Sequence, residues 1–290
     1  MRFSDWATRI MLIFLMFAAL ILALYVGRIT QVQGNIKISN PAVISSNQYP
    51  KLEFQSEKTP ASKSQNVAKS AVKKSQPVGI YKTTVAFAKY RPQYEVSPID
   101  PSNYGERYTT DINGIPLNNQ PIIVLHETSN SASSAINFFR TPHDNENIQA
   151  SYHTLIKQDG TVVYLIPPDK RAFGAGNSVF DGAYGLETVK TNPNLPPSVN
   201  NFAYHVSLET PPDGWGDNHQ TSHSGYTNSQ YSSLAWLIAQ SQVPDQRITT
   251  HRAVDRSGQR VDPLSFDFNK FFNLLHSFRE VRGINSIKKP

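Results

Sequence analysis

The sequence predicts an α/β fold: a mixed central β-sheet flanked by helices, preceded by an N-terminal hydrophobic helix and a disordered tether. Three observations support this prediction. Strand-like and helix-like patterns interleave along residues 95–282, which is typical of a layered α/β domain. One pair of strand patterns surrounds a hairpin signal, which adds an antiparallel pair to the sheet. The segment is long enough, at roughly 185 residues, for one hydrophobic core.

Residues 1–29 contain an unbroken apolar run of 17 residues, Ile10–Val26. This length is at the lower end of the roughly 17–25 residues of a membrane-spanning helix. Arg2 and Arg9 precede the run and only Arg28 follows it closely, so the rest of the chain should face outward. We expect a membrane anchor, with a cleaved signal peptide as the open alternative. Either reading predicts export, with the folded domain on the extracytoplasmic side, in the periplasm or at the cell wall.

Residues 30–94 are poor in apolar periodicity and rich in Ser, Lys, Gln, Asn and Pro, which predicts a flexible linker. Residues 1–100 hold 13 Lys and Arg against 5 Asp and Glu, whereas residues 101–290 hold 15 against 17. The basic charge therefore belongs to the N-terminal part, which argues against a nucleic-acid-binding domain. Weak attraction of the linker to an anionic membrane or wall polymer is an alternative to a solvated tether. The chain has no Cys, which excludes disulfides, thiolate ligands and a Cys nucleophile.

Three segments have the apolar or alternating patterns that are typical of β-strands. They are residues 121–128, 151–167 and 202–210. The middle segment contains Asp159-Gly160, the strongest short-range signal for a hairpin, so we expect two antiparallel strands there.

Three further segments are predicted to be helices. They are residues 131–140, 229–241 and 266–278. In the second, apolar side chains recur from Tyr231 to Ile238 at helical spacing. Ser129 or Asn130 is the expected N-cap of the first helix. Residues 283–290 are expected to form a tail beyond the domain.

Two imidazoles and one carboxylate form a candidate metal site. His126 ends the first apolar strand, His251 follows the β-compatible segment RITT, and Asp262 lies 11 positions after His251. Functional groups gather where a rigid strand ends in open space. This ligand set suits a catalytic zinc that keeps its fourth position for water. From spacing alone the alternatives remain open, namely buried structural His residues and an Asp that caps a turn before Pro263.

Five sequence blocks carry a resemblance to a known family. VLHET, SYHTLIKQDGTVVYLIPPDKRAFGAGNS, VSLET, THRAVD and VDPLSFDF appear in this order between roughly Pro121 and Phe278. Together they resemble the zinc-dependent N-acetylmuramoyl-L-alanine amidases of type 2, a family that includes phage lysozyme-like amidases and peptidoglycan-recognition proteins. The resemblance implies the fold of that family, Zn²⁺ as cofactor, and peptidoglycan or muropeptides as substrate. It also implies cleavage between the lactyl group of N-acetylmuramic acid and L-alanine.

The resemblance assigns roles to individual positions. The family's three zinc ligands fall on His126, His251 and Asp262. Its catalytic Glu falls on Glu209, at the end of VSLE, and the Tyr that precedes a His in the hairpin's first strand falls on Tyr152.

The sequence departs from the family pattern at two places. Arg260 stands where the family has a Lys, two positions before the third ligand. Arg keeps its proton, so we expect Arg260 to stabilise an oxyanion electrostatically rather than to donate a proton. FGAG at Phe173–Gly176 replaces the family's Trp-His-Ala-Gly, so a pocket His is missing. Trp215 and Asn177 are assigned to substrate binding, although Trp215 could equally pack against the protein.

Other residues close to the motifs receive weaker roles. His153 alternates away from Tyr152 in its strand and is expected to be a hydrogen-bonded structural His. Glu127 follows the first ligand but should point to the opposite face of the sheet, so it receives no role. His219 and His223 are expected in a loop, where contact with substrate stays open.

Two other classes of function are weighed against an exported, membrane-tethered, monomeric amidase. The first is a non-catalytic peptidoglycan-binding module of the same fold. Such modules characteristically lose a zinc ligand, and here all three are present. The second is a glycosidase with paired carboxylates, for which the sequence offers no partner to Glu209.

Overall fold

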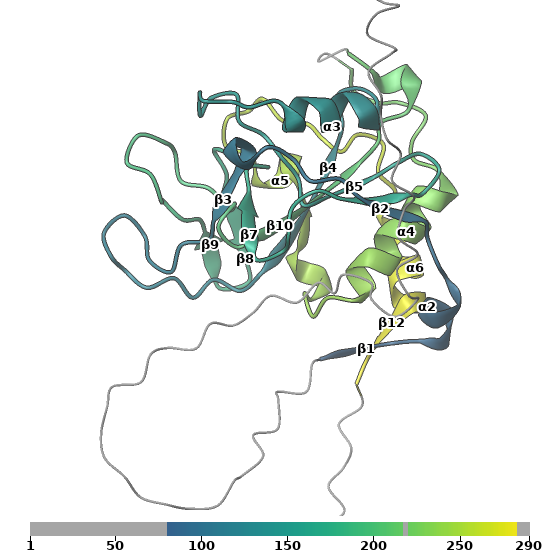
Figure 1. Cartoon of the computed structure of the whole chain (residues 1–290). Coiled ribbons are helices and arrows are strands. Elements are labelled where there is room, and N and C mark those ends of the chain that lie inside the picture. Colours follow the sequence, from purple (N-terminus) through teal and green to yellow (C-terminus); the bar gives the residue numbers. More distant parts are fainter. Residues whose placement is uncertain (1–79, 217–219, 283–290) are drawn as a thin grey trace, which may run out of the picture. The chain divides into compact units, whose positions relative to one another are not determined.

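The computed structural model describes residues 80–216 and 220–282 (Figure 1). The predicted anchor at residues 1–29, most of the predicted linker and the predicted tail at residues 283–290 lie outside this part of the chain. In chain order the strands and helices are β1 (Tyr81–Thr83), α2 (Val85–Lys89), β2 (Tyr94–Val96), β3 (Tyr104–Glu106), β4 (Ile122–Glu127), α3 (Ala132–Arg140), β5 (Thr154–Ile156), β6 (Val162–Tyr164), β7 (Lys170–Ala172), β8 (Phe180–Gly182), β9 (Gly185–Glu187), β10 (Ala203–Leu208), α4 (Asn228–Ala239), β11 (Ile248–Thr250), α5 (His251–Val254), α6 (Phe268–Phe278) and β12 (Arg279–Val281).

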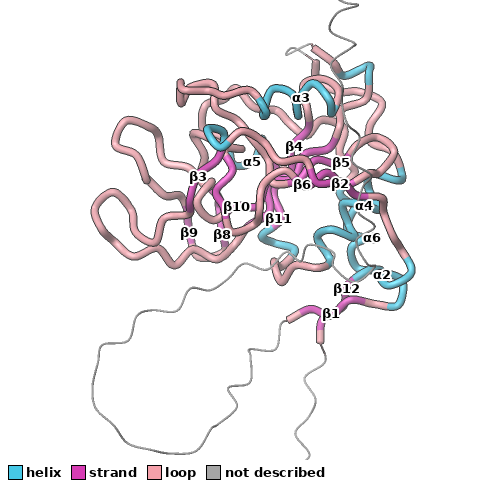
Figure 2. Tube along the Cα trace, viewed as in Figure 1, coloured by secondary structure: helices cyan, strands magenta, loops and turns pink. Residues whose placement is uncertain are grey.

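A six-stranded mixed sheet forms the centre of the domain, in the order β11-β4-β10-β5-β6-β2 (Figure 2). The four strands β11, β4, β10 and β5 run parallel to one another, and β6 is antiparallel to β5. The predicted mixed sheet is therefore confirmed. Because β4, β10 and β11 are parallel, their carboxyl ends meet at one edge, where the sequence places its chemistry.

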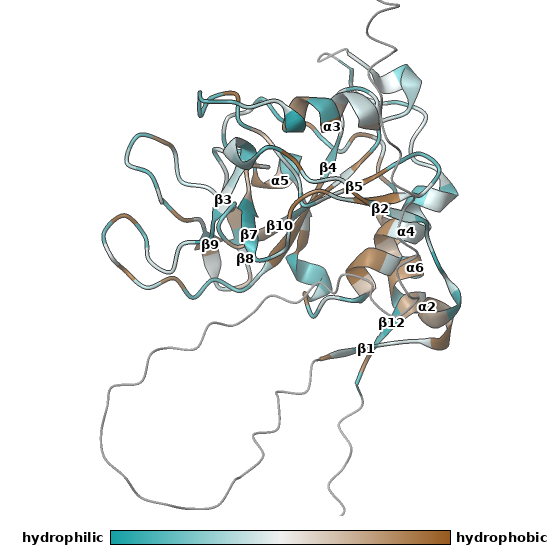
Figure 3. Ribbon diagram, viewed as in Figure 1, coloured by the Kyte–Doolittle hydropathy of each residue, from teal (hydrophilic) through white to brown (hydrophobic). Residues whose placement is uncertain are grey.

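Helices cover the two faces of this sheet, with α3 on one side and α4 and α6 on the other (Figure 1). On α3 the buried side chains Ala132, Ile136 and Phe139 recur at helical spacing and pack with Leu155 of β5. Apolar residues concentrate in the central strands and in α4 and α6 (Figure 3). Burial of these side chains, worth about 25 cal/mol per Å² of apolar surface, holds the layers together and makes the sheet edge rigid.

The N-caps of the helices are set by hydroxyl side chains. Ser131, rather than the predicted Ser129 or Asn130, caps α3, because its side chain accepts a hydrogen bond from the backbone N–H of Ser134. Thr227 and Gln230 form a capping box at the start of α4. Each cap satisfies backbone donors that the helix itself leaves free.

The predicted hairpin is confirmed as β5 and β6. Its turn places Gly160 at φ +89°, a left-handed conformation that a side chain disfavours. A Cβ atom at Gly160 would also lie 2.9 Å from the Cβ of Ser229, in the first turn of α4. The turn glycine therefore serves both the hairpin and the close approach of α4.

The folded region begins earlier than predicted. Residues 81–89, which the sequence analysis placed in the linker, form β1 and α2. Partners distant in sequence order them, since β1 pairs with β12 and the ring of Phe87 stacks on Trp236 at 5.7 Å between centroids. A hollow of about 720 Å³ is bounded by β1 and by Gln120 and Pro121, which precede β4. Within the described residues no helix is both long enough and apolar enough to cross a membrane.

Candidate metal centre

The three predicted ligands meet at the carboxyl ends of β4 and β11. His126 is the fifth residue of β4 and is fully buried. His251 opens α5 directly after β11, which pairs in parallel with β4. Asp262 returns to the same edge from the loop after α5, where Gly258 adopts φ +72°. The parallel pairing thus brings together residues that lie more than a hundred positions apart.

The ligand atoms face one another. Nδ1 of His251 lies 3.0 Å from Oδ1 of Asp262, and Nδ1 of His126 lies 3.4 Å from Oδ2 of the same carboxylate. One ligand atom from each residue lies within 4.8 Å of the other two. The His126 and His251 rings are 4.6 Å apart between centroids. A small ion between these atoms would have three protein ligands.

The electrostatics of the cluster suit a cation. The pKa of His126 is lowered to about 4, mainly by burial and also by the charges of His251 and Arg260, against the opposing effect of Asp262. Burial alone would raise the pKa of Asp262, but its contacts with His126 and His251 bring it below its ordinary value. At neutral pH His126 is therefore neutral and Asp262 ionised, which are the states in which they bind metals.

The residues present fit a zinc ion. Among the described residues Nδ1 of His126 is buried and makes no hydrogen bond. A lone pair there that faces a buried carboxylate costs free energy unless a cation lies between the two groups. The donor set of two imidazoles and one carboxylate is one that catalytic zinc sites use. Each group is a borderline or hard ligand, and no thiolate is required.

Tyr152 and Arg260 both interact with the metal cluster, and their catalytic roles stay predictions. The ring centroid of Tyr152 is 4.7 Å from that of His126. Burial raises the pKa of Tyr152, so its phenol stays protonated and can donate a hydrogen bond. Arg260 is exposed on the ligand loop, and its charge lowers the pKa values of both His126 and Tyr152. Arg260 is thus close enough to act electrostatically on the cluster.

Glu209 follows β10 on the same face of the sheet as His126, by the alternation of side chains along paired strands. Its two carboxylate oxygens accept hydrogen bonds from the backbone N–H groups of Ala132, at 2.7 Å, and Gln158, at 2.9 Å. These bonds orient the carboxylate between the start of α3 and the hairpin turn. Its catalytic role stays a prediction.

The two predicted substrate-binding residues flank the edge from different segments. The Trp215 indole donates a hydrogen bond to the carbonyl of Thr210 at 2.8 Å, and the residue as a whole is 41% exposed. The Asn177 carbonyl accepts a hydrogen bond from the backbone N–H of Arg256 at 2.9 Å, in the segment after α5. Contact of either residue with substrate stays a prediction.

Glu127 makes structural hydrogen bonds that the sequence did not predict. Its Oε2 atom accepts hydrogen bonds from the hydroxyl of Tyr226, from Nε2 of His223 at 2.9 Å and from the backbone N–H of Leu264 at 3.0 Å. Leu264 lies two residues after the ligand Asp262. Glu127 therefore ties the ligand loop to the end of β4. In the sequence, only its position beside His126 pointed to this role. Its hydrogen-bond partners come from distant segments, which local patterns do not reveal.

His205 on β10 was also left without a role. Its Nδ1 atom lies 2.9 Å from Nε2 of His126. The sequence did carry a signal for a position near the site. His205 and Glu209 differ by an even number of positions, so they share one face of their strand. His153, expected to be a structural His, accepts a hydrogen bond from the backbone N–H of His205 at 3.0 Å.

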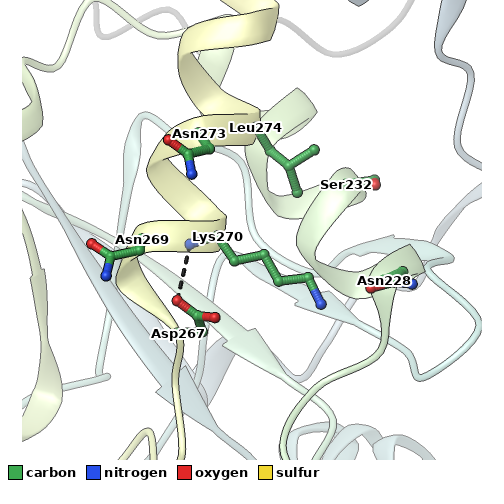
Figure 4. A pocket seen from close by; sticks show the side chains of 7 residues that line it. All are labelled: Asn228, Ser232, Asp267, Asn269, Lys270, Asn273 and Leu274. Carbon is green, nitrogen blue, oxygen red and sulfur yellow. Dashed lines mark hydrogen bonds between the residues drawn. The ribbon is translucent and has the colours of Figure 1, made fainter.

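A separate hollow of about 730 Å³ lies between α4 and α6 (Figure 4). Asp267 caps α6 there by accepting a hydrogen bond from the backbone N–H of Lys270 at 2.9 Å. The hollow is lined by Asn228, Ser232, Asp267, Asn269, Lys270, Asn273 and Leu274. None of these residues belongs to the metal cluster, so the hollow has no part in the site.

Comparison with known families defines the class of the protein. Residues 118–265 match the sequence profile of the family described as N-acetylmuramoyl-L-alanine amidase. This segment is half of the chain and contains all three ligands. The chain belongs to the N-acetylmuramoyl-L-alanine amidase family, and the resemblance drawn from its motifs is confirmed.

Several solved structures are similar to part of the chain. A crystal structure of a Se-Met AmpD derivative is 23% identical over 63% of this chain and 94% of its own, with a TM-score of 0.42. The solution structure of Citrobacter freundii AmpD is 23% identical over 63% and 90%, with a TM-score of 0.38. The Staphylococcus aureus hydrolase AmiA in complex with its ligand is 18% identical over 66% and 84%, with a TM-score of 0.39. No curated protein matches the chain.

Proposed function

We propose that the protein is a zinc-dependent amidase that hydrolyses the amide bond between N-acetylmuramic acid and the L-alanine of peptidoglycan. The observation that carries this proposal is the convergence of His126, His251 and Asp262 within 4.8 Å at a rigid sheet edge. The family to which the chain belongs supports the choice of substrate.

The surrounding residues have the chemistry that amide hydrolysis needs. Zinc held by the three ligands would supply Lewis acidity toward the scissile carbonyl. Glu209 would take a proton from the attacking water and return it to the alanine nitrogen as the carbon–nitrogen bond breaks. Each of its oxygens accepts one backbone hydrogen bond and keeps a further lone pair for this purpose. Arg260 would stabilise the negative charge that develops on the carbonyl oxygen, and Tyr152 would donate a hydrogen bond to that oxygen.

Mass spectrometry of muropeptides before and after digestion tests this proposal. We expect release of intact stem peptides with a free L-alanine amine, loss of activity with a chelator, and recovery with Zn²⁺. His251→Ala should abolish cleavage, whereas His276→Ala, which removes an exposed imidazole, should leave it unchanged. Cleavage that resists the chelator or survives His251→Ala would show that the proposal is wrong. Binding of muropeptides without cleavage would instead identify the non-catalytic module.

We further propose that the domain acts as a monomer outside the cytoplasm, attached to a membrane by its N-terminal segment. The apolar run Ile10–Val26 and the arginines Arg2 and Arg9 support this location. Fractionation of cells that produce the protein, followed by protease treatment of intact cells or spheroplasts, should find the domain in the membrane fraction and accessible from outside. Sedimentation of the solubilised protein should give the mass of one chain.

A further inference from the structure

A second buried histidine lies behind the first metal ligand. His205, on β10, is fully buried, and its ring centroid is 5.1 Å from that of His126. Nδ1 of His205 is 2.9 Å from Nε2 of His126. The other ring nitrogen of His126, Nδ1, faces the carboxylate of Asp262. The two nitrogens of His126 therefore have different neighbours, one in the metal cluster and one in the core.

This arrangement determines where the protons lie. A neutral His126 that offers Nδ1 to a metal must carry its proton on Nε2. That N–H group then donates a hydrogen bond to Nδ1 of His205, which has to be unprotonated. A metal-ligating imidazole generally needs such an acceptor on its other nitrogen, because the acceptor fixes the tautomer and the ring orientation. Here a neutral imidazole takes the place usually filled by a carboxylate or a carbonyl.

The backbone holds the His205 ring in place. The backbone N–H of His205 donates to Nδ1 of His153 at 3.0 Å, and the backbone N–H of His153 donates to the carbonyl of His205 at 3.0 Å. The His153 and His205 rings are nearly parallel, with 8° between their planes. Nε2 of His153 faces the carbonyl of Lys170 at 3.1 Å, which assigns its proton to that nitrogen. His205 is thus fixed from the side opposite the metal ligand.

A glycine makes room for this ring. A Cβ atom added to Gly174 would lie 2.4 Å from Nδ1 of His205 and 2.5 Å from its Cγ. Any side chain at position 174 would therefore displace His205 from its present position. Gly174 is the second residue of FGAG, where the resembling family has a His. The absence of a side chain at this position is what the His205 ring requires.

We propose that His205 is a positioning residue that holds His126 in the tautomer and orientation required for metal binding, and that Gly174 is required because it admits the His205 ring. This inference rests on the zinc site proposed above. It assigns a function to His205, which lies outside the metal cluster.

Asn and Leu at position 205 separate acceptor chemistry from packing. The two side chains have the same branched shape, but the Asn Oδ1 atom can replace Nδ1 as acceptor, whereas Leu offers none. In zinc competition with a chromophoric chelator we expect His205→Leu to weaken zinc affinity about 10- to 100-fold. His205→Asn should stay within about threefold of the unmutated protein. His143→Leu removes another buried histidine, one that contacts Asn103 instead of the cluster, and should leave zinc affinity unchanged. The visible spectrum of bound Co²⁺ should change only in His205→Leu.

Substitution of Gly174 tests the second half of the proposal. Gly174→Ala should lower both the urea midpoint of the zinc-free protein and the zinc affinity, because its Cβ clashes with the His205 ring. The double variant Gly174→Ala/His205→Ala removes the clash. It should recover the urea midpoint, while its zinc affinity stays as low as that of His205→Leu.

The outcomes separate this inference from the proposed function. Equal zinc affinity in His205→Leu and His205→Asn, or zinc affinity as in the unmutated protein in the double variant, would overturn the positioning role alone. Failure of the unmutated protein to bind zinc would overturn the zinc site, and this inference with it.

Discussion

Oε2 of Glu127 lies 3.0 Å from the backbone nitrogen of Leu264 and so connects the residue after one metal ligand to the loop that carries another. The same oxygen also accepts hydrogen bonds from His223 and Tyr226. A single carboxylate therefore joins three segments that are distant in sequence. Its removal should affect the position of Asp262 before it affects the sheet.

Glu127→Gln tests this connection. All three donors meet at Oε2, and a neutral amide oxygen in its place accepts hydrogen bonds more weakly than the carboxylate does, so all three bonds should weaken. We expect a loss of about 1–3 kcal/mol in the free energy of unfolding and weaker zinc binding. Urea unfolding and chelator competition measure the two effects. Glu95→Gln, which removes the exposed ion pair with Lys157, is the control and should change stability by less than about 1 kcal/mol. Unchanged zinc affinity in Glu127→Gln would argue against a link to Asp262.

Removal of zinc should destabilise the protein. A ligand that binds only the folded state at about 1,000 times its dissociation constant adds about 4 kcal/mol. For a domain of this size that corresponds to a rise in Tm of roughly 8–16 °C. Calorimetry with Zn²⁺ and with chelator measures the difference. His251→Ala should show little dependence of Tm on zinc, and a full zinc-dependent shift in that variant would place the ion elsewhere.

Arg260 should act through its charge. Arg260→Met should lower kcat about 100-fold, as loss of an oxyanion donor does, with little change in KM. Arg260→Lys keeps the charge and should retain activity to within about tenfold of the unmutated enzyme. Arg252→Met, at an exposed position of α5, is the matched control. Equal losses in the Lys and Met variants would show that guanidinium geometry, rather than charge, is what matters.

The stability of the folded protein should decrease as the pH is lowered, because the buried imidazoles resist protonation. Burial lowers the pKa of His153 to about 3 from its ordinary 6.5. Between these pH values the unfolded chain binds a proton that the folded protein does not, so stability is full above pH 6.5 and declines below it. Each such group contributes about 1.4 kcal/mol per pH unit. Urea unfolding of the chelated protein between pH 7 and 4.5 should show this slope. His153→Asn should reduce this slope by the equivalent of about one proton taken up on unfolding. His276→Gln leaves the buried histidines in place and serves as the control.

The turn of the β5–β6 hairpin should tolerate no side chain. Gly160→Ala combines a disfavoured φ of +89° with a contact of 2.9 Å to Ser229, so we expect a loss of about 2–4 kcal/mol. Gly114→Ala has a similar φ of +77° but nothing within 4 Å, so it should lose about 1–2 kcal/mol. The difference between the two variants in urea unfolding isolates the steric part. Equal losses would mean that α4 moves aside freely.

Periodicity predicted the elements that dominate the core, and motif order predicted which three candidate ligands the fold brings together. The buried strands β4 and β10 and the helices α3, α4 and α6 form where local patterns indicate, because each buries a face that its own residues define. The grouping of His126, His251 and Asp262 followed from a resemblance over five ordered blocks. Parallel strand pairing then accounts for it physically.

Contacts between distant segments explain what the sequence did not predict. A strand of three residues and a helix of five, β1 and α2, carry too little local signal and depend on β12 and Trp236. The part played by Glu127 depends on Leu264, and that of His205 depends on the absence of a side chain at Gly174. Such relationships arise only when the chain is folded, so no pattern within a short window could indicate them.

The pair of β1 and β12 lies toward the amino end of β4, away from the candidate metal site. Tyr81 and Arg282 line the same hollow as Pro121, which lies at the amino end of β4. His126 lies near the carboxyl end of this strand, roughly 17 Å beyond Pro121 at about 3.3 Å per residue. The first described residues of the chain thus lie at the opposite edge of the sheet from the candidate metal ligands. The membrane attachment proposed above would therefore leave the edge that carries His126 open to a polymeric substrate.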